Sequence, residues 1–147
     1  MRSRHTFSRH LSAGVLAALA VGGLTVAAQP ASATPGVISV DSAVYATPGG
    51  HGNFRWRYAA GAGHECRITP TGRSLAVECD ARPSAVRLFG RHVTATTYDN
   101  PWASAKRIKP NHQISVEGVT CVVGYRASVT CNTRSAKFTI VDGVVKH

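Results

Sequence analysis

The chain has 147 residues, of which 44% are hydrophobic and 16% charged, and its formal charge is +10. This length accommodates one ordinary domain, or one domain and a processing segment. The hydrophobic fraction argues against wholesale disorder. Seven acidic residues, without a dense Cys/His tract, leave few ways to build a hydrolase or a metal centre.

The first 33 residues have the pattern of a cleaved signal peptide. Three arginines, with no acidic residue, precede an almost wholly apolar stretch over 11–28, and Ala31-Ser32-Ala33 gives the small-x-small pattern of a cleavage site. A retained membrane anchor is the alternative, since such a stretch could just span a bilayer. We expect export with cleavage after Ala33 and no membrane span after processing. Loss of the three arginines leaves fourteen basic and seven acidic residues, a formal charge of +7.

After the leader we expect residues 34–45 to be a flexible start or a first strand, and residues 46–147 to form a single β-domain. Within 34–45, the run Val37–Val40 is the segment that favours a strand.

The four cysteines fall in two local pairs, and the first pair brackets a predicted hairpin. An even number of cysteines in an exported chain indicates disulfides, although four of them permit three connectivities. If Cys66 faces Cys79, Arg67 lies opposite Glu78 and Ile68 opposite Val77. A one-residue slip would separate both pairs, so the pattern favours a Cys66–Cys79 bridge.

The second pair shows the same arrangement. If Cys121 faces Cys131, Val123 lies opposite Val129 on the same side, with turn residues between the two strands. Each bridge would contribute about 3 kcal/mol by restricting the unfolded chain. Zinc is the other use of four cysteines, but neither spacing suits a zinc ribbon or finger. The shared Val-x-Cys pattern of the two units is either a faint duplication or two solutions to one problem.

Elsewhere the chain reads as short strands separated by turn residues. Residues 54–58 alternate aromatic side chains with arginines, and the aromatic ones are expected in the core. One segment, 100–107, favours a helix of about two turns, with Asn100 as its N-cap. We therefore predict a small all-β antiparallel sandwich or barrel, with two disulfide-clamped hairpins and at most one short helix. Further strands are expected at 86–89, 92–98, 114–116, 138–141 and 144–145, with a tight turn at Asp142-Gly143.

Five short runs carry a family pattern: Val116–Cys121, Ala127–Cys131, Lys137–Ile140, Ala46–Gly50 and Val77–Cys79. The first three resemble the "GVTC…VTC…GFTI" run of small exported actinobacterial domains of unknown function, and the last two are similar to the "TPSG…C…VxC" run of the same domains. The resemblance covers residues 46–141 and implies an exported, disulfide-stapled domain with local cysteine pairing. This chain departs from the pattern in the long distance from Pro48 to its first cysteine. No catalytic residues come with the family.

Basic side chains give two candidate anion-binding groups. Arg55 and Arg57 share one face of the alternating strand, and a second group follows in the chain near an aromatic residue. A charge of +7 favours polyanions by non-specific attraction, and the alternative is a solvated basic face that keeps the protein soluble. The second group consists of Trp102, Lys106, Arg107, Lys109 and His112.

No catalytic motif is recognisable, and we assign no catalytic residue, metal ligand or cofactor. Two weaker arrangements are a carboxylate pair at Glu78 and Asp80, and His64-Glu65 with a distant histidine, as in a secreted ribonuclease. The sequence favours an exported, monomeric, non-enzymatic binding domain at the cell envelope or outside it. Its expected partners are anionic envelope polymers or a protein, rather than nucleic acid. The alternatives are a small secreted hydrolase such as a nuclease, or an inhibitor-like effector that presents residues 69–74.

Overall fold

The computed structural model of the chain describes residues 36–97 and 105–146. Within these ranges the chain forms eleven β-strands and a 3-10 helix, η1 (Ser42–Tyr45). No helix in these ranges is long and apolar enough to cross a membrane. The strands are β1 (Ile38–Ser39), β2 (Phe54–Arg57), β3 (Glu65–Thr71), β4 (Ser74–Cys79), β5 (Ala85–Phe89), β6 (His92–Thr96), β7 (His112–Val116), β8 (Val119–Val123), β9 (Val129–Asn132), β10 (Lys137–Val141) and β11 (Val144–Lys146).

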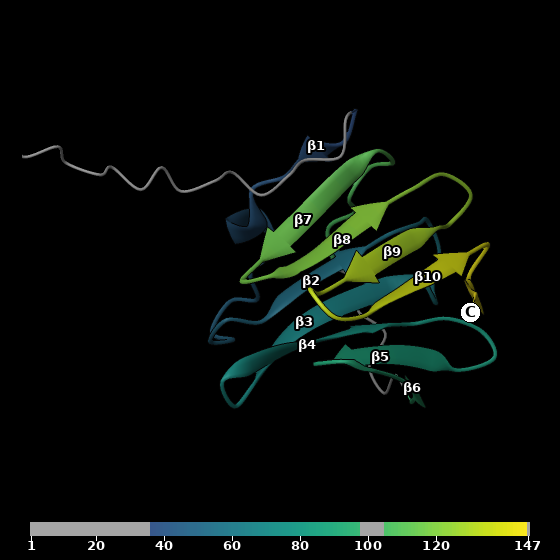
Figure 1. Cartoon of the computed structure of the whole chain (residues 1–147). Helices are drawn as coiled ribbons and strands as arrows, with labels where there is room; N and C mark the ends of the chain where they lie inside the picture. Colours follow the sequence, from purple (N-terminus) through teal and green to yellow (C-terminus); the bar gives the residue numbers. More distant parts are fainter. Residues whose placement is uncertain (1–35, 98–104, 147) are drawn as a thin grey trace, which may run out of the picture.

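The strands form two sheets that pack as a sandwich, as the sequence predicted (Figure 1). One sheet has the order β2-β3-β4-β5-β6, and the other has the order β1-β7-β8-β9-β10-β11. Neighbours are antiparallel and consecutive in the chain, apart from β1, which pairs in parallel with β7. Each sheet thus contains a five-stranded meander, because short turns join successive strands.

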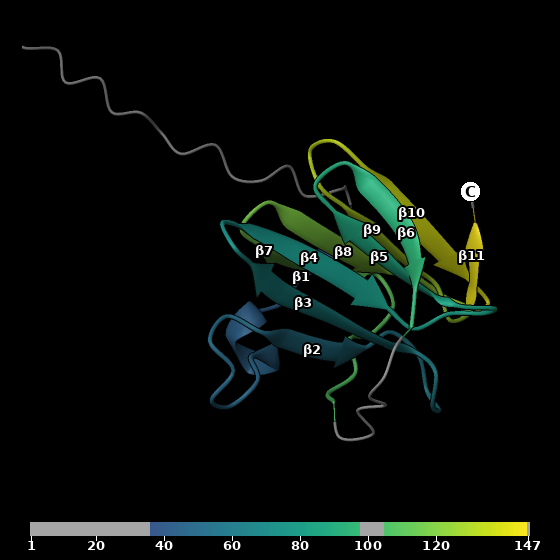
Figure 2. The same ribbon diagram turned by 90° about the horizontal axis from the view of Figure 1, so that it is seen from below.

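The core lies between the sheets, which Figure 2 shows from below. Alternation along each strand places apolar side chains on the inner face and polar ones on the outer face. In β2, Trp56 is fully buried, and Tyr58 just after the strand is 1% exposed. The predicted assignment of these aromatic residues to the core is therefore confirmed.

Both predicted disulfides are present. Cys66 bonds to Cys79 across β3 and β4, and Cys121 bonds to Cys131 across β8 and β9. All four are fully buried in the core, and the described residues contain no free cysteine. The registers are the predicted ones, since Arg67 faces Glu78 and Val123 faces Val129. Disulfides of this kind fit an oxidising compartment.

The two meanders correspond strand by strand. Each disulfide joins the second strand of its meander to the third, and Cys79–Val93 matches Cys131–Val145 without a gap. The resemblance of the two cysteine units therefore extends over both sheets. Corresponding inner-face pairs are Val77–Leu88 with Val129–Ile140, Cys79–Val86 with Cys131–Phe138, and Leu88–Val93 with Ile140–Val145.

Two segments differ from the sequence prediction. The expected helix at 100–107 lies mostly outside the described residues, but its last part is extended, and Arg107 bridges to Arg57 in parallel. This segment satisfies the edge of β2, whose outer N–H and C=O groups would otherwise lack partners. The start of the domain is ordered by β1, where the Ile38 amide donates to the carbonyl of Asn111 at 2.9 Å. Residues 1–35, including the predicted signal peptide, lie outside the described residues.

Candidate anion-binding surface

A row of charged side chains crosses the outer face of the β2–β6 sheet. Arg55 pairs in register with Arg67, Arg67 with Glu78, and Glu78 with Arg87. Positions that are directly opposite on neighbouring strands share a face and lie about 5 Å apart, so the row is continuous over four strands. Three guanidinium groups and one carboxylate leave it with a formal charge of +2. We call these four residues the arginine row.

Glu78 is held between two of the arginines. The Arg67 Nε donates to Glu78 Oε2 at 2.6 Å, and Arg67 Nη2 forms an ion pair with the same oxygen. The Arg87 Nε lies 3.4 Å from the other carboxylate oxygen. Glu78 is 9% exposed, whereas the side chains of Arg67 and Arg87 are 28% and 37% exposed. The carboxylate therefore orients the two guanidinium groups while part of each still faces solvent.

The edge of β2 joins the two basic groups that the sequence separated by some fifty residues. The Arg57 amide donates to the carbonyl of Lys106 at 2.9 Å, and the Ile108 amide donates to the carbonyl of Arg57 at 3.0 Å. The Arg57 Nε also donates to the carbonyl of Ala105 at 3.0 Å. Lys106 and Arg107 thus lie beside β2, while the Arg57 guanidinium also secures the segment.

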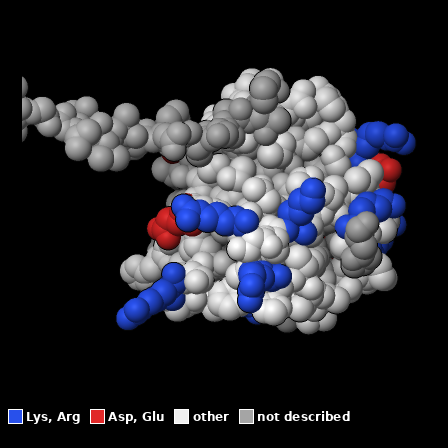
Figure 3. All heavy atoms as spheres, in the orientation of Figure 1, with Lys and Arg blue, Asp and Glu red and all other residues white. Residues whose placement is uncertain are grey.

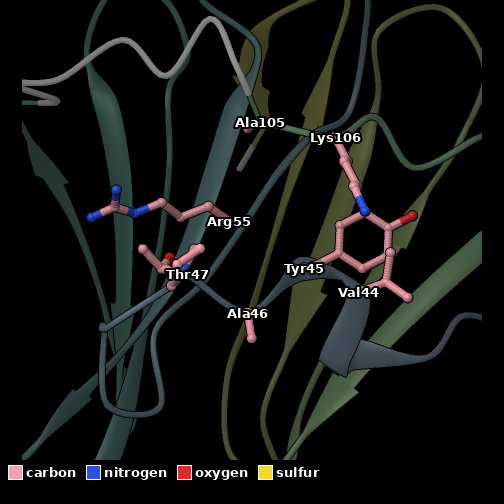
Figure 4. A pocket seen from close by; sticks show the side chains of 8 residues that line it. Val44, Tyr45, Ala46, Thr47, Arg55, Ala105 and Lys106 are labelled. Atoms are coloured by element: carbon pink, nitrogen blue, oxygen red, sulfur yellow. The ribbon is translucent and has the colours of Figure 1, made fainter.

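A pocket of about 400 Å³ adjoins this edge, and Tyr45, Arg55 and Lys106 line it. In Figure 4, Arg55 extends to the opposite side from Tyr45 and Lys106. Burial raises the pKa of the Tyr45 phenol above its usual value, so this group is uncharged at neutral pH. The pocket therefore places Lys106 beside an aromatic ring and a hydroxyl group, while the Arg55 guanidinium points away from them.

The remaining predicted residues do not join this surface. Lys109 is exposed in the link to β7 and belongs neither to the pocket lining nor to the arginine row. His112 begins β7, where its Nδ1 lies 2.9 Å from the carbonyl oxygen of Pro110, so the ring is engaged in its own turn. Trp102 lies outside the described residues. In Figure 3, Lys and Arg far outnumber acidic residues on the visible face.

Sequence reasoning missed Arg67 and Arg87 as site residues. The sequence pattern indicates Arg67 only as the partner of Glu78, and Arg87 only as part of a strand. The neighbour of Arg87 on the next strand is Glu78, which belongs to a different hairpin. No local sequence pattern indicates that pairing. The available signal was the alternation Val86-Arg87-Leu88, which puts the arginine on the outer face.

The geometry does not assemble the weaker catalytic arrangements. Glu78 is occupied by two arginines, and Asp80 uses its backbone carbonyl to accept from Tyr58 Oη at 2.6 Å. The His64 ring packs edge-on against Tyr58, with 5.4 Å between centroids, and Glu65 is 1% exposed. Burial, with the nearby Asp80 and Glu65 carboxylates, raises the Tyr58 pKa far above its usual value. Tyr58 and Glu65 are buried at this end of the sandwich, and His64 and Asp80 are half-buried beside them.

The segment proposed for an inhibitor loop is regular hairpin. Strand pairing continues through Thr69–Ala76 to Thr71–Ser74, which leaves only Gly72 and Arg73 as the turn. Residues 69–74 therefore do not form a projecting loop.

Comparisons with protein-family models, curated proteins and solved structures found no match. Among the described residues, no three His, Cys, Asp or Glu side chains are grouped to hold a metal ion.

Proposed function

We propose that this chain is an exported, non-enzymatic binding domain that holds anionic polymers at or outside the cell envelope. The arginine row is the observation that carries the proposal. It presents three guanidinium groups on one sheet face, and guanidinium N–H groups are well suited to hydrogen bonds with carboxylate or phosphate oxygens. The Tyr45–Lys106 pocket continues the cationic surface beyond Arg55.

The internal repeat provides a comparison on the same scaffold. The outer row of the second meander occupies the equivalent register positions but carries a single charged residue, at Lys146. There, the hydroxyl oxygens of Thr130 and Thr139 lie 3.1 Å apart in a neutral contact. The fold therefore does not need charges at these positions, which supports a binding role for those of the first meander. The second row consists of Gln113, Val122, Thr130, Thr139 and Lys146.

Retention on anionic cell-wall material and on immobilised heparin tests the proposal. We expect bound protein to decline steeply between about 50 and 500 mM salt, because screening and counterion release govern contacts between exposed charges. Retention that ignores ionic strength would contradict electrostatic binding. The R55Q/R87Q variant should bind more weakly and lower the salt slope by about 1 for each lost contact.

The matched control is K137Q/K146Q, which removes two charges from exposed positions on the other sheet. Equal losses in both variants would show that net charge alone drives retention and would refute the arginine row as the site. Incubation of the oxidised protein with RNA and with cell-wall substrates distinguishes a binding domain from a hydrolase. Turnover of either substrate would contradict a function in binding alone.

A further inference from the structure

Hairpin turns from both sheets surround a second pocket, of about 450 Å³, at one end of the sandwich. Arg73, Arg91 and Arg134 line it, together with Ser74, Ser135 and Glu117. We propose that this turn pocket binds a phosphomonoester group. The inference goes beyond the proposed function, because the pocket lies on the turns and shares no residue with the arginine row or the Tyr45–Lys106 pocket.

Two of the arginines come from identical turns. Gly72-Arg73 joins β3 to β4, and Gly90-Arg91 joins β5 to β6, each as a two-residue turn between paired strand ends. Both glycines have positive φ, at 63° and 60°, which the first position of such a turn requires. The same backbone geometry therefore presents an arginine at the end of two neighbouring hairpins.

The third arginine comes from the other sheet and is fixed by Thr133. The Thr133 hydroxyl accepts from the amides of Ser135 and Ala136 at 3.3 Å, which orders the turn that contains Arg134. The same hydroxyl lies 3.2 Å from the carbonyl oxygen of Gly90 and bonds to it. This contact ties the Arg134 turn to the Gly90-Arg91 turn across the two sheets, so the backbone on these two sides of the pocket is held in place.

Within the part of the chain that the structure describes, Arg73, Arg91 and Arg134 make no ion pair, and all three are exposed. Glu117 is the carboxylate that lines the pocket, and it begins a turn with Gly118 in which both residues have positive φ. Three cations against one carboxylate around one depression give it a net positive potential, which attracts an anion.

At the opposite end of the sandwich, the equivalent segments of the repeat contact each other directly. In the internal repeat, Arg82 corresponds to Arg134, and its amide donates to the carbonyl of Gly143 at 2.7 Å. Arg82 also forms an isolated β-bridge with Val144. The Arg126 Nε lies 3.9 Å from the Asp142 Oδ1. That end is packed and its arginines have protein partners, whereas the turn pocket is open and its arginines have none among the described residues.

Charge and shape select the ligand class. Three guanidinium groups and the Glu117 carboxylate sum to a formal +2, which a phosphomonoester matches with a charge of about −1.5 to −2 at pH 7. Its three terminal oxygens offer hydrogen-bond acceptors to the three arginines that line the pocket, one from each turn. A carboxylate or a sulfate ester carries one charge and would leave half of the pocket charge uncompensated.

Titration of ¹⁵N-labelled protein with methyl phosphate tests the proposal, and methyl sulfate serves as the matched singly charged probe. We expect amide shifts confined to residues 72–74, 90–91, 117–118 and 133–135, with weaker effects of methyl sulfate. Affinity for methyl phosphate should rise with pH through about 6, where the second charge forms. Shifts that spread over the arginine row, or equal affinity for the two probes, would overturn the proposal.

The variant R91Q/R134Q should weaken methyl phosphate binding by about tenfold or more, since each lost charged hydrogen bond is worth about that factor. K109Q/K137Q removes two charges elsewhere and should leave the affinity unchanged, so an equal loss there contradicts the site. Dispersed spectra from both variants establish that they are folded. Retention of R91Q/R134Q on heparin separates this proposal from the previous one, because heparin binding should persist when methyl phosphate binding is lost.

Discussion

Glu78 has two effects at the residue scale that act in opposite directions. It stabilises the arginine row through its contacts with Arg67 and Arg87, and it also cancels one of the three positive charges that an anionic polymer would meet. Stability and binding should therefore respond oppositely to its removal.

We expect Glu78→Gln to lower the free energy of unfolding by about 1–3 kcal/mol, because charged hydrogen bonds are lost and two guanidinium groups face each other without a carboxylate. Retention on heparin should become stronger because the row gains a unit of positive charge. Urea unfolding and salt elution measure the two effects. Weaker retention by a folded variant would contradict the assignment of the row.

Tyr58 provides a test by pH. Its pKa is raised by burial, so the folded protein holds the phenolic proton more tightly than the unfolded chain, whose tyrosine titrates near 10. The contribution of this proton to the free energy of unfolding is fully present below pH 10. It is lost as the pH rises above 10, at up to about 1.4 kcal/mol per pH unit.

The comparison for this test is Tyr58→Phe, which removes the hydrogen bond to Asp80 and should cost about 1 kcal/mol at pH 7. The variant has no phenolic proton to lose, so its deficit relative to the natural protein should shrink between about pH 9 and 11. Denaturant unfolding at several pH values measures this difference. A deficit that is constant with pH would show that Tyr58 does not titrate with unfolding.

At the scale of elements, the hairpins are local units whose turn, register and disulfide agree with one another. Thus Cys66 faces Cys79, and Asp142-Gly143 forms the predicted tight turn with two positive φ values. Pairing between hairpins is not local: β4 meets β5 through a connection that includes Pro83, and β1 pairs with β7 although all of β2–β6 lies between them in the chain. Sequence alternation indicates which face each strand buries, but not which strand lies beside it.

The two disulfides enclose loops of similar length, with sequence separations of 13 and 10. We expect the C66A/C79A and C121A/C131A variants each to lose about 3 kcal/mol, because the loop-closure entropy of the unfolded chain depends only weakly on length. Chemical denaturation of both variants measures the losses. Since each pair lies in the same core, a much larger loss in one variant would indicate that packing, rather than chain entropy, dominates.

At the scale of the whole molecule, we predict a monomer. Among the described residues, the large exposed apolar side chains are spread over several elements: Ile38 on β1, Val44 on η1, Phe89 on β5, Val93 on β6 and Tyr125 after β8. We predict a single species of monomeric mass in sedimentation velocity across a wide range of protein concentration. A mass that rises with concentration would contradict this prediction.

The sequence by itself determined the all-β class, the two disulfides and their registers, because alternation, turn residues and cross-strand pairs act within a few residues of one another. It also indicated that Arg55 and Arg57 face away from the aromatic core. Only the tertiary structure decided that Arg87 joins Glu78, that Lys106 lies beside Arg57, and that three arginines meet at the turn pocket. Those contacts join separate hairpins and sheets, and they arise from sheet order and from the packing of one sheet on the other.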